Sequence, residues 1–283
     1  MFSKQTGYKL TGILLTSIAF IALAGNIDTF KSYFSQKQTK STISSKNKTT
    51  SSKKEQQKNT NIYKFNKTIK KYKTLPATTI VDVKNFKKQH LKQLFYSSTI
   101  SDDLFSRIKG KSYKANCTVP LDELRYIRIL YIGFDKKTHI GELIVNKSIA
   151  KDVKNIFFKL YQHNYQLEKV VLVDEYDADD NRSMADNNTS SFNYRVVEGT
   201  THLSKHSLGM AIDINPRYNP YIHTLNGETV CSPSNGTDYA DRSKNFPHKI
   251  DTSDYAYQLF TQYGFSWGGA WNSSKDYQHF QKD

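Results

Sequence analysis

Four side chains in the last third of the sequence have the residue types and the spacing of a catalytic metal site. His206 and Asp213 stand seven residues apart around a small apolar run, and Asp276 and His279 begin and end the tetrapeptide Asp-Tyr-Gln-His. Two imidazoles and one carboxylate are a sufficient ligand set for zinc, and three protein ligands with a fourth position for water are typical of catalytic zinc sites. We therefore predict that His206, Asp213 and His279 bind zinc.

Asp276 is the predicted general base of this site. It lies three residues before His279, close enough to take a proton from a water molecule at the metal. A carboxylate in that place can accept the proton of the attacking water and later transfer it to the leaving amine. The alternative for Asp276 is a salt bridge with Lys275 or another surface cation. The predicted chemistry is hydrolysis.

Three separated motifs, in this order, resemble a family of zinc peptidases. They are the His-x6-Asp pair, the Trp-Gly-Gly at residues 267–269 and the final Asp-x-x-His. They are similar to the D-alanyl-D-alanine carboxypeptidase and L-alanyl-D-glutamate endopeptidase family, which includes VanY-like carboxypeptidases and several phage endolysins. The resemblance extends from about residue 80 to the C-terminus. It implies an α+β domain with a central antiparallel sheet flanked by helices, as in Hedgehog and D-Ala-D-Ala peptidases, and peptidoglycan stem peptides as substrates.

The resemblance also implies roles for residues around the metal. An arginine commonly stabilises the negatively charged oxygen of the tetrahedral intermediate in these enzymes, and both Arg195 and Arg182 qualify, with Arg195 favoured. Ser204 matches a small hydroxyl residue two positions before the first ligand, where it can bind the substrate backbone. Trp271 is expected to line the cleft. The family often has an acidic residue where this chain has Ala270, a departure that removes neither a ligand nor the base.

The positive charge of the chain is concentrated before the predicted domain. Of the formal net charge of +15, residues 1–75 hold +13, with 15 lysines against Asp28 and Glu55. The rest of the chain is close to neutral, so the high pI does not indicate a nucleic-acid-binding surface, although a Lys-rich arm could contact a polyanion such as teichoic acid. We expect no nucleic-acid partner and a monomeric protein.

The N-terminal segments indicate export. Residues 1–25 are predicted to be a signal peptide or a membrane anchor, because two lysines precede an apolar run at 10–25 that ends in small residues. That run is slightly shorter than the ~20 residues of a membrane-spanning helix, so cleavage and membrane attachment both remain open. Residues 26–75, rich in Lys, Ser, Thr and Asn, are predicted to be a disordered linker. Either alternative places the catalytic domain outside the cytoplasm, at the cell envelope or secreted.

Residues 76–283 are predicted to form one peptidase domain. The spacing of apolar residues and the turn signals predict helices at 101–110, 149–160 and 252–263 and strands at 125–134, 139–145, 169–176, 192–197 and 210–214. The polar loop at 177–190 is expected to form one wall of the cleft, with calcium binding as a weaker alternative. Residues 215–251 are expected to be mostly loop and to cover the cleft. Cys117 and Cys231 fit an oxidising compartment, and whether they pair stays open.

Several functional alternatives remain at this point. The choice between a D-Ala-D-Ala carboxypeptidase and an L-Ala-D-Glu endopeptidase is open. A different class of function is a catalytically inactive, zinc-binding relative that acts as a cell-wall-binding or interaction module, against which the presence of Asp276 counts. A third is an adhesin that acts through the Lys-rich linker and keeps the catalytic fold as a relic.

Overall fold

The computed structural model describes residues 62–63, 65–197 and 200–283. The chain divides into two compact units, residues 1–63 and 64–283. The signal peptide or anchor predicted at 1–25 and residues 26–61 of the predicted linker lie outside the described residues. The prediction of a disordered linker is wrong for its end, because residues 65–74 are helical and Ile69 is buried in the main hydrophobic core. Among the helices that are described, none is both long enough and apolar enough to cross a membrane.

The second unit is a mixed helix and sheet fold built on small antiparallel sheets. Residues 65–74 are helical, and the helices that follow are α2 (Lys88–Leu91), α3 (Asp102–Ile108), α4 (Ala150–Gln162), α5 (Asp180–Ala185) and α6 (Tyr255–Gln262). The strands are β1 (Tyr96–Ser98), β2 (Leu124–Ile132), β3 (Thr138–Asn146), β4 (Ala211–Asp213), β5 (Tyr221–Leu225), β6 (Glu228–Ser232), β7 (Ser266–Trp267), β8 (Lys275–Asp276) and β9 (His279–Gln281).

These strands form three separate three-stranded sheets with the orders β1-β2-β3, β4-β9-β7 and β6-β5-β8. The α+β class and the antiparallel pairing agree with the prediction. The single central sheet does not, because the strands of the described part of the chain are distributed over three sheets.

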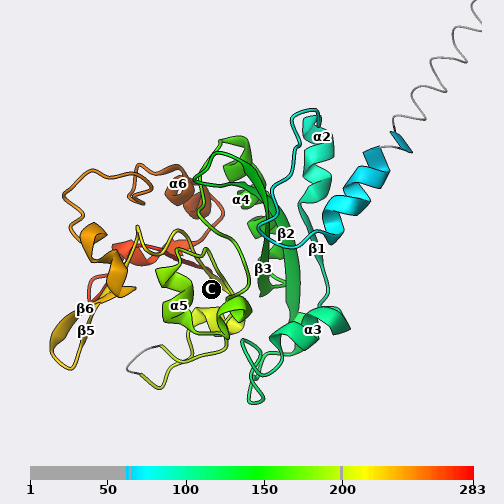
Figure 1. The fold of residues 1–283 in the computed structure, drawn as a ribbon. Helices are drawn as coiled ribbons and strands as arrows, with labels where there is room; N and C mark the ends of the chain where they lie inside the picture. Colours follow the sequence, from blue (N-terminus) through cyan, green and yellow to red (C-terminus); the bar gives the residue numbers. More distant parts are fainter. Residues whose placement is uncertain (1–61, 64, 198–199) are drawn as a thin grey trace, which may run out of the picture. The chain divides into compact units, whose positions relative to one another are not determined.

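The β2–β3 hairpin and α4 form the frame of the domain. The two strands pair from Leu124 opposite Asn146 to Ile132 opposite Thr138, and their alternate side chains enter the main hydrophobic core. Helix α4 covers this hairpin (Figure 1) and packs against β2 and α6. Its buried stripe recurs at helical spacing, as predicted, and consists of Val153, Ile156, Phe157 and Leu160.

The segment at 215–251, expected to be mostly loop, contains the β5–β6 hairpin. Asn226 and Gly227 form its turn, and both have positive φ angles of 53° and 86°. Asn-Gly is the strongest short sequence signal for a two-residue hairpin turn, and it was present in this sequence. The hairpin matters for the site because β5 also pairs with β8, where Tyr221 stands opposite Asp276.

The strand predicted at 169–176 is not formed. Its second half, Val173–Tyr176, is a 3-10 helix, and its first half pairs with a side chain in place of a strand. The amide of Asn188 accepts from the Val171 N–H at 2.9 Å and donates to the Val171 carbonyl at 3.0 Å. The Asn188 side chain thus satisfies both backbone groups of Val171, while the Val170 carbonyl accepts from the Glu142 N–H of β3 at 3.1 Å. These contacts satisfy the backbone without a regular strand pairing.

The strand predicted at 192–197 is replaced in the same way. The hydroxyl of Ser207 accepts from the Arg195 N–H at 2.7 Å and donates to the Arg195 carbonyl at 2.5 Å. One isolated bridge, Val196 opposite Leu203, is its only ladder pairing among the residues that the structure covers. The apolar pattern correctly indicated a buried extended segment. The backbone groups of Arg195, however, bind the side chain of Ser207 and not a neighbouring strand.

The two cysteines are both free. The thiol of Cys117 donates to the Val119 carbonyl at 3.9 Å, and that of Cys231 donates to the Pro233 carbonyl at 3.6 Å. Burial raises the pKa of each thiol, which keeps both in the less reactive protonated form.

Asp254 is the N-cap of helix α6, two residues after the start of the helix predicted at 252–263. The Asp254 carboxylate accepts from the backbone N–H groups of Ala256 at 2.8 Å and Tyr257 at 3.2 Å and from the Tyr165 hydroxyl at 3.2 Å. Burial nevertheless raises the pKa of Asp254 to about 6, because desolvation disfavours its charged form more than these hydrogen bonds favour it.

Asp254 therefore gives a prediction on pH-dependent stability. Its folded pKa lies above its unfolded value, so it contributes stability at low pH that is lost as the pH rises through about 6. We expect Asp254→Asn, which keeps the capping oxygen, to raise the free energy of unfolding by about 1–3 kcal/mol at pH 7 and by little at pH 4. Urea titrations at the two pH values test this. Asp254→Ala, which removes the cap, should instead cost about 1 kcal/mol at both.

Candidate active site

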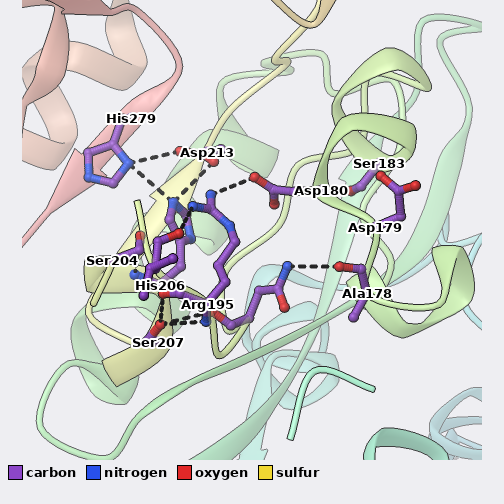
Figure 2. A network of polar contacts seen from close by, with 12 residues as sticks. Ala178, Asp179, Asp180, Ser183, Arg195, Ser204, His206, Ser207, Asp213 and His279 are labelled. Carbon is purple, nitrogen blue, oxygen red and sulfur yellow. Dashed lines mark hydrogen bonds and ion pairs between the residues drawn. The ribbon is translucent and has the colours of Figure 1, made fainter. Parts of the chain in front are cut away.

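The three predicted metal ligands converge in the structure, each from a different element. His206 lies on a short 3-10 helix, Lys205–Leu208, while Asp213 ends β4 and His279 begins β9. Because β4 and β9 are antiparallel neighbours with Asp213 opposite His279, the sheet itself brings two of the three together. All three side chains are buried, and Figure 2 shows them pointing toward one another.

The distances between the ligand atoms fit one zinc ion. His206 Nε2 lies 3.1 Å from Asp213 Oδ2, and His279 Nδ1 lies 3.1 Å from Asp213 Oδ1. The two nitrogens are 3.2 Å apart. Two ligands at ordinary zinc distances and a tetrahedral angle are about 3.3 Å apart, so the three groups could bind one ion with small adjustments. No other cluster of this kind occurs among the described His, Cys, Asp and Glu residues.

The outer nitrogen of each histidine is held by an oxygen. His206 Nδ1 lies 2.6 Å from the Ser191 carbonyl, and His279 Nε2 lies 3.0 Å from Oε1 of Gln281. Because these oxygens can only accept, the outer nitrogens carry the protons, and the inner nitrogens turn their lone pairs toward Asp213. Such contacts fix the tautomer and the ring orientation of metal-binding histidines. The two nitrogen lone pairs and the Asp213 carboxylate would repel one another at these distances, so a cation or a proton is needed between them.

The electrostatics of the cluster also favour a cation. Burial disfavours the charged forms of both His206 and Asp213, yet their mutual attraction outweighs it. The pKa of His206 is therefore raised, and the pKa of Asp213 is lowered, with a further contribution from His279. Asp213 is thus a carboxylate at neutral pH, as a zinc ligand must be.

The cluster opens into a cavity of about 400 Å³. Asp276 lines this cavity, with Oδ2 4.0 Å from His279 Nδ1. Its Oδ1 is buried and has no hydrogen-bond partner among the described residues. Burial raises the pKa of Asp276 to about 7, against the attraction of His279, which lowers it. Asp276 is thus a mostly buried carboxyl beside the ligand cluster, in the place predicted for the general base.

The Trp-Gly-Gly segment allows Asp276 to approach the ligands. A Cβ atom on Gly268 would lie 2.7 Å from the Asp276 carbonyl oxygen and 2.8 Å from its Cβ. A Cβ on Gly269 would lie 2.2 Å from the ring of Trp267, which is buried and donates to the Tyr277 carbonyl at 2.9 Å. Both glycines are therefore required by close packing.

Gly268→Ala is expected to displace Asp276 and to leave the ligands near their places. A misplacement of about 1 Å can reduce turnover by about 100-fold, so we expect a loss of that order in kcat with zinc still bound. Activity assays and zinc analysis of the purified variant test this. Gly227→Ala is the control for a strained glycine substitution away from the site, because Gly227 lies at the exposed hairpin turn with a φ of 86° and nothing lies near the added Cβ. Unchanged turnover in Gly268→Ala would show that this packing does not position the base.

The structure distinguishes between the two predicted arginines. Arg195 lines the cavity, and its Nη2 lies 2.5 Å from Asp180 Oδ2. Arg182 is exposed, pairs with Asp177 at 3.6 Å and is not among the residues that line the cavity. Of the two, only Arg195 is placed to reach a substrate bound at the cluster.

Ser204 and Trp271 both line the cavity. The hydroxyl oxygen of Ser204 accepts from the His206 N–H at 3.2 Å, so it caps the 3-10 helix and keeps its own hydrogen for another acceptor. The Trp271 ring lies 5.3 Å from the His279 ring, centroid to centroid.

Several residues that line the cavity were not singled out from the sequence. Asp180, Asn181 and Met184 come from α5, within the loop predicted to form a cleft wall, and that expectation is met. Tyr221 and Ser232 come from the unpredicted hairpin. Gln278 lies between Asp276 and His279 in the Asp-x-x-His motif, so the motif could have identified it as a residue of the cavity.

Comparisons with known proteins agree with this geometry. Residues 198–282 match a family model described as D-alanyl-D-alanine carboxypeptidase. The match contains the three proposed ligands and Asp276, whereas Arg195 and Asp180 precede it. No curated protein and no solved structure matches the chain significantly. The resemblance noted in the sequence is thereby confirmed over residues 198–282, where this chain is similar to the D-alanyl-D-alanine carboxypeptidase family of peptidases.

Proposed function

We propose that this chain is a zinc peptidase that hydrolyses peptide bonds of peptidoglycan stem peptides. The observation that carries the proposal is the convergence of His206, Asp213 and His279 beside Asp276 in one cavity, within the segment that matches the peptidase family. The two histidines, oriented by their outer hydrogen bonds, and the ionised Asp213 would hold the zinc ion. Zinc in such a site lowers the pKa of water and polarises the scissile carbonyl.

Asp276 moves the proton in the proposed reaction. As a carboxylate it accepts a proton from the attacking water, and as a carboxylic acid it returns that proton to the nitrogen of the leaving amine. Its raised pKa suits both halves of this cycle near neutral pH, because neither form is strongly disfavoured. The buried setting of the cavity wall strengthens these interactions by excluding water.

Arg195 and Ser204 are proposed to bind the substrate carbonyl groups. The Nε atom of Arg195 is a buried donor with no partner among the described residues, and the Ser204 hydroxyl retains a hydrogen to donate. Donors fixed before the reaction stabilise the negative charge that develops on the carbonyl oxygen. Trp271 is proposed to form an apolar wall for the substrate.

The proposed substrate requires export. Peptidoglycan lies outside the cytoplasm, and the apolar run at 10–25 followed by the Lys-rich linker at 26–75 is the sequence feature that supports delivery to the envelope. Attachment through residues 10–25 or release after cleavage would both bring the domain to its substrate. We propose that it acts there as a monomer on stem peptides.

Mass spectrometry of muropeptides incubated with the full chain tests the proposal. We expect new fragments that end at one defined stem-peptide bond, loss of these fragments with a chelator, and their return when zinc is added. Asp276→Asn is the matched inactive control. Binding of muropeptides without any cleavage, in the presence of zinc, would contradict the proposal and favour the wall-binding alternative.

A further inference from the structure

The cations of the proposed active-site cavity already have anionic partners. Arg195 and Lys205 are the only Lys or Arg residues among the described residues that line it. Arg195 Nη2 lies 2.5 Å from Asp180 Oδ2, and Lys205 Nζ lies 2.7 Å from Asp283 Oδ1. A substrate with a free carboxylate next to the scissile bond would therefore meet two cations whose charge is already shared.

The Arg195–Asp180 pair is the more consequential of the two. Both side chains are about three-quarters buried, with exposed fractions of 25% and 23%, whereas Asp283 is 85% exposed. Exposed ion pairs contribute little to stability, and solvent can replace one partner. Figure 2 shows the Arg195 guanidinium directed at Asp180. Arginine binds a carboxylate with two hydrogen bonds, either from Nη1 and Nη2 or from Nε and Nη2. Asp180 binds Nη2, so it competes with a substrate carboxylate in both arrangements.

The carboxyl groups that line the cavity favour the same kind of ligand. A carboxamide or a continuing peptide offers N–H groups, whereas a carboxylate offers only acceptors and would face the carboxyl groups of Asp180 and Asp276.

We infer that Asp180 is a specificity-determining residue, an inference that rests on the proposed function. By neutralising Arg195, it makes the cavity select stem peptides in which the α-carboxyl group of the residue after the scissile bond is an amide, either a carboxamide or a continuing peptide. The corresponding free acid is the poorer substrate. Arg195 keeps its Nε–H, a single donor that suits the neutral carbonyl of the scissile bond.

Two matched pairs of peptides test the inference with the full chain loaded with zinc. The first pair is acetyl-L-Lys-D-Ala-D-Ala and its C-terminal carboxamide. The second is L-Ala-γ-D-Glu-L-Lys and the same peptide with the α-carboxyl group of D-Glu converted to a carboxamide. For whichever bond is cut, we expect kcat/KM for the amide to exceed that for the acid by about tenfold or more, a discrimination of the size that contacts in a pocket supply.

The variant Asp180→Asn releases the charge of Arg195 at almost constant side-chain size. We expect it to raise kcat/KM for the free acid and to bring the amide-to-acid ratio toward one. Asp177→Asn is the matched control, because it removes the same charge from the same loop at a residue that pairs with Lys111 at 2.9 Å and with Arg182, outside the cavity. Its ratio should equal that of the unmodified chain.

The outcomes separate the inference from the function on which it rests. A preference for the free acid, or an amide-to-acid ratio that Asp180→Asn leaves unchanged, overturns the inference while the peptidase assignment stands. An equal loss on both peptides of a pair in Asp180→Asn also overturns it, because Asp180 would then only position Arg195. If none of the four peptides is cleaved, the proposed function fails and the inference fails with it.

Discussion

Asp276→Asn is expected to lower kcat by about 100-fold to 10,000-fold, the usual contribution of a general acid–base group. Asparagine keeps the size and the acceptor oxygen of the side chain, but it cannot take a proton from water or return one to the leaving amine. Asp276 does not belong to the three-residue ligand cluster, with Oδ2 4.0 Å from His279 Nδ1. Zinc content and the thermal stability with zinc should therefore be unchanged, and KM should change little.

The measurement is steady-state turnover of the stem peptide bond found by mass spectrometry, together with zinc analysis of the same preparation. Asp241→Asn is a matched control, since Asp241 is half exposed and its carboxylate interacts with Ser243 and Lys244, outside the cavity. Turnover within about threefold of the unmodified chain in Asp276→Asn would contradict the assigned role, because a general base is worth at least about 100-fold.

His279→Ala is expected to abolish both stable zinc binding and turnover. The substitution removes one of three ligands, and it leaves Asp213 with a single partner, His206, at 3.1 Å. Zinc bound only by the folded state at 1,000 times its dissociation constant stabilises that state by about 4 kcal/mol. The unmodified chain should therefore show a large zinc-dependent rise in melting temperature, and His279→Ala should show almost none.

Thermal unfolding with and without zinc, and metal analysis after gel filtration, test this second prediction. His202→Ala is a stringent control, because His202 is exposed and lies only four residues before His206. It should keep the full zinc-dependent shift. Retention of one zinc ion per chain in His279→Ala would show that the ligand set is wrong.

The parts of the site carried by short motifs could be predicted from the sequence. His206 and Asp213 flank a segment short enough to form one 3-10 turn followed by β4, and the Asp-x-x-His motif forms β8 and the start of β9. Their residue types restrict the chemistry strongly, because two imidazoles and a carboxylate have few joint uses other than binding a metal. The helices whose apolar residues recur at a clear helical period, such as α4, could also be predicted from the sequence.

What could not be predicted depends on contacts between distant parts of the chain. The pairing of Asp180 with Arg195 joins an acidic loop to an extended segment, and no local pattern encodes which of several acidic residues makes it. The segments at 169–176 and 192–197 have the apolar pattern of strands, yet the side chains of Asn188 and Ser207 replace the strand partners. A continuous apolar run indicates burial on both faces of a segment, but it does not indicate which groups satisfy the hydrogen bonds of its backbone.

The division into three small sheets was missed for a related reason. Strands of two or three residues, such as β7 and β8, leave almost no periodic signal. Their positions follow from tight packing, as at Gly268 against Asp276, where the absence of a Cβ decides how closely two segments approach.

The central claim is that His206, Asp213 and His279 share one zinc ion. Anomalous diffraction at the zinc absorption edge, from crystals of the zinc-loaded chain, tests it most directly. The account predicts a single strong peak at about 2.0–2.2 Å from one nitrogen of each histidine and one oxygen of Asp213, as is usual for zinc. A peak bound by other residues, or the absence of any peak between these three side chains, would contradict it.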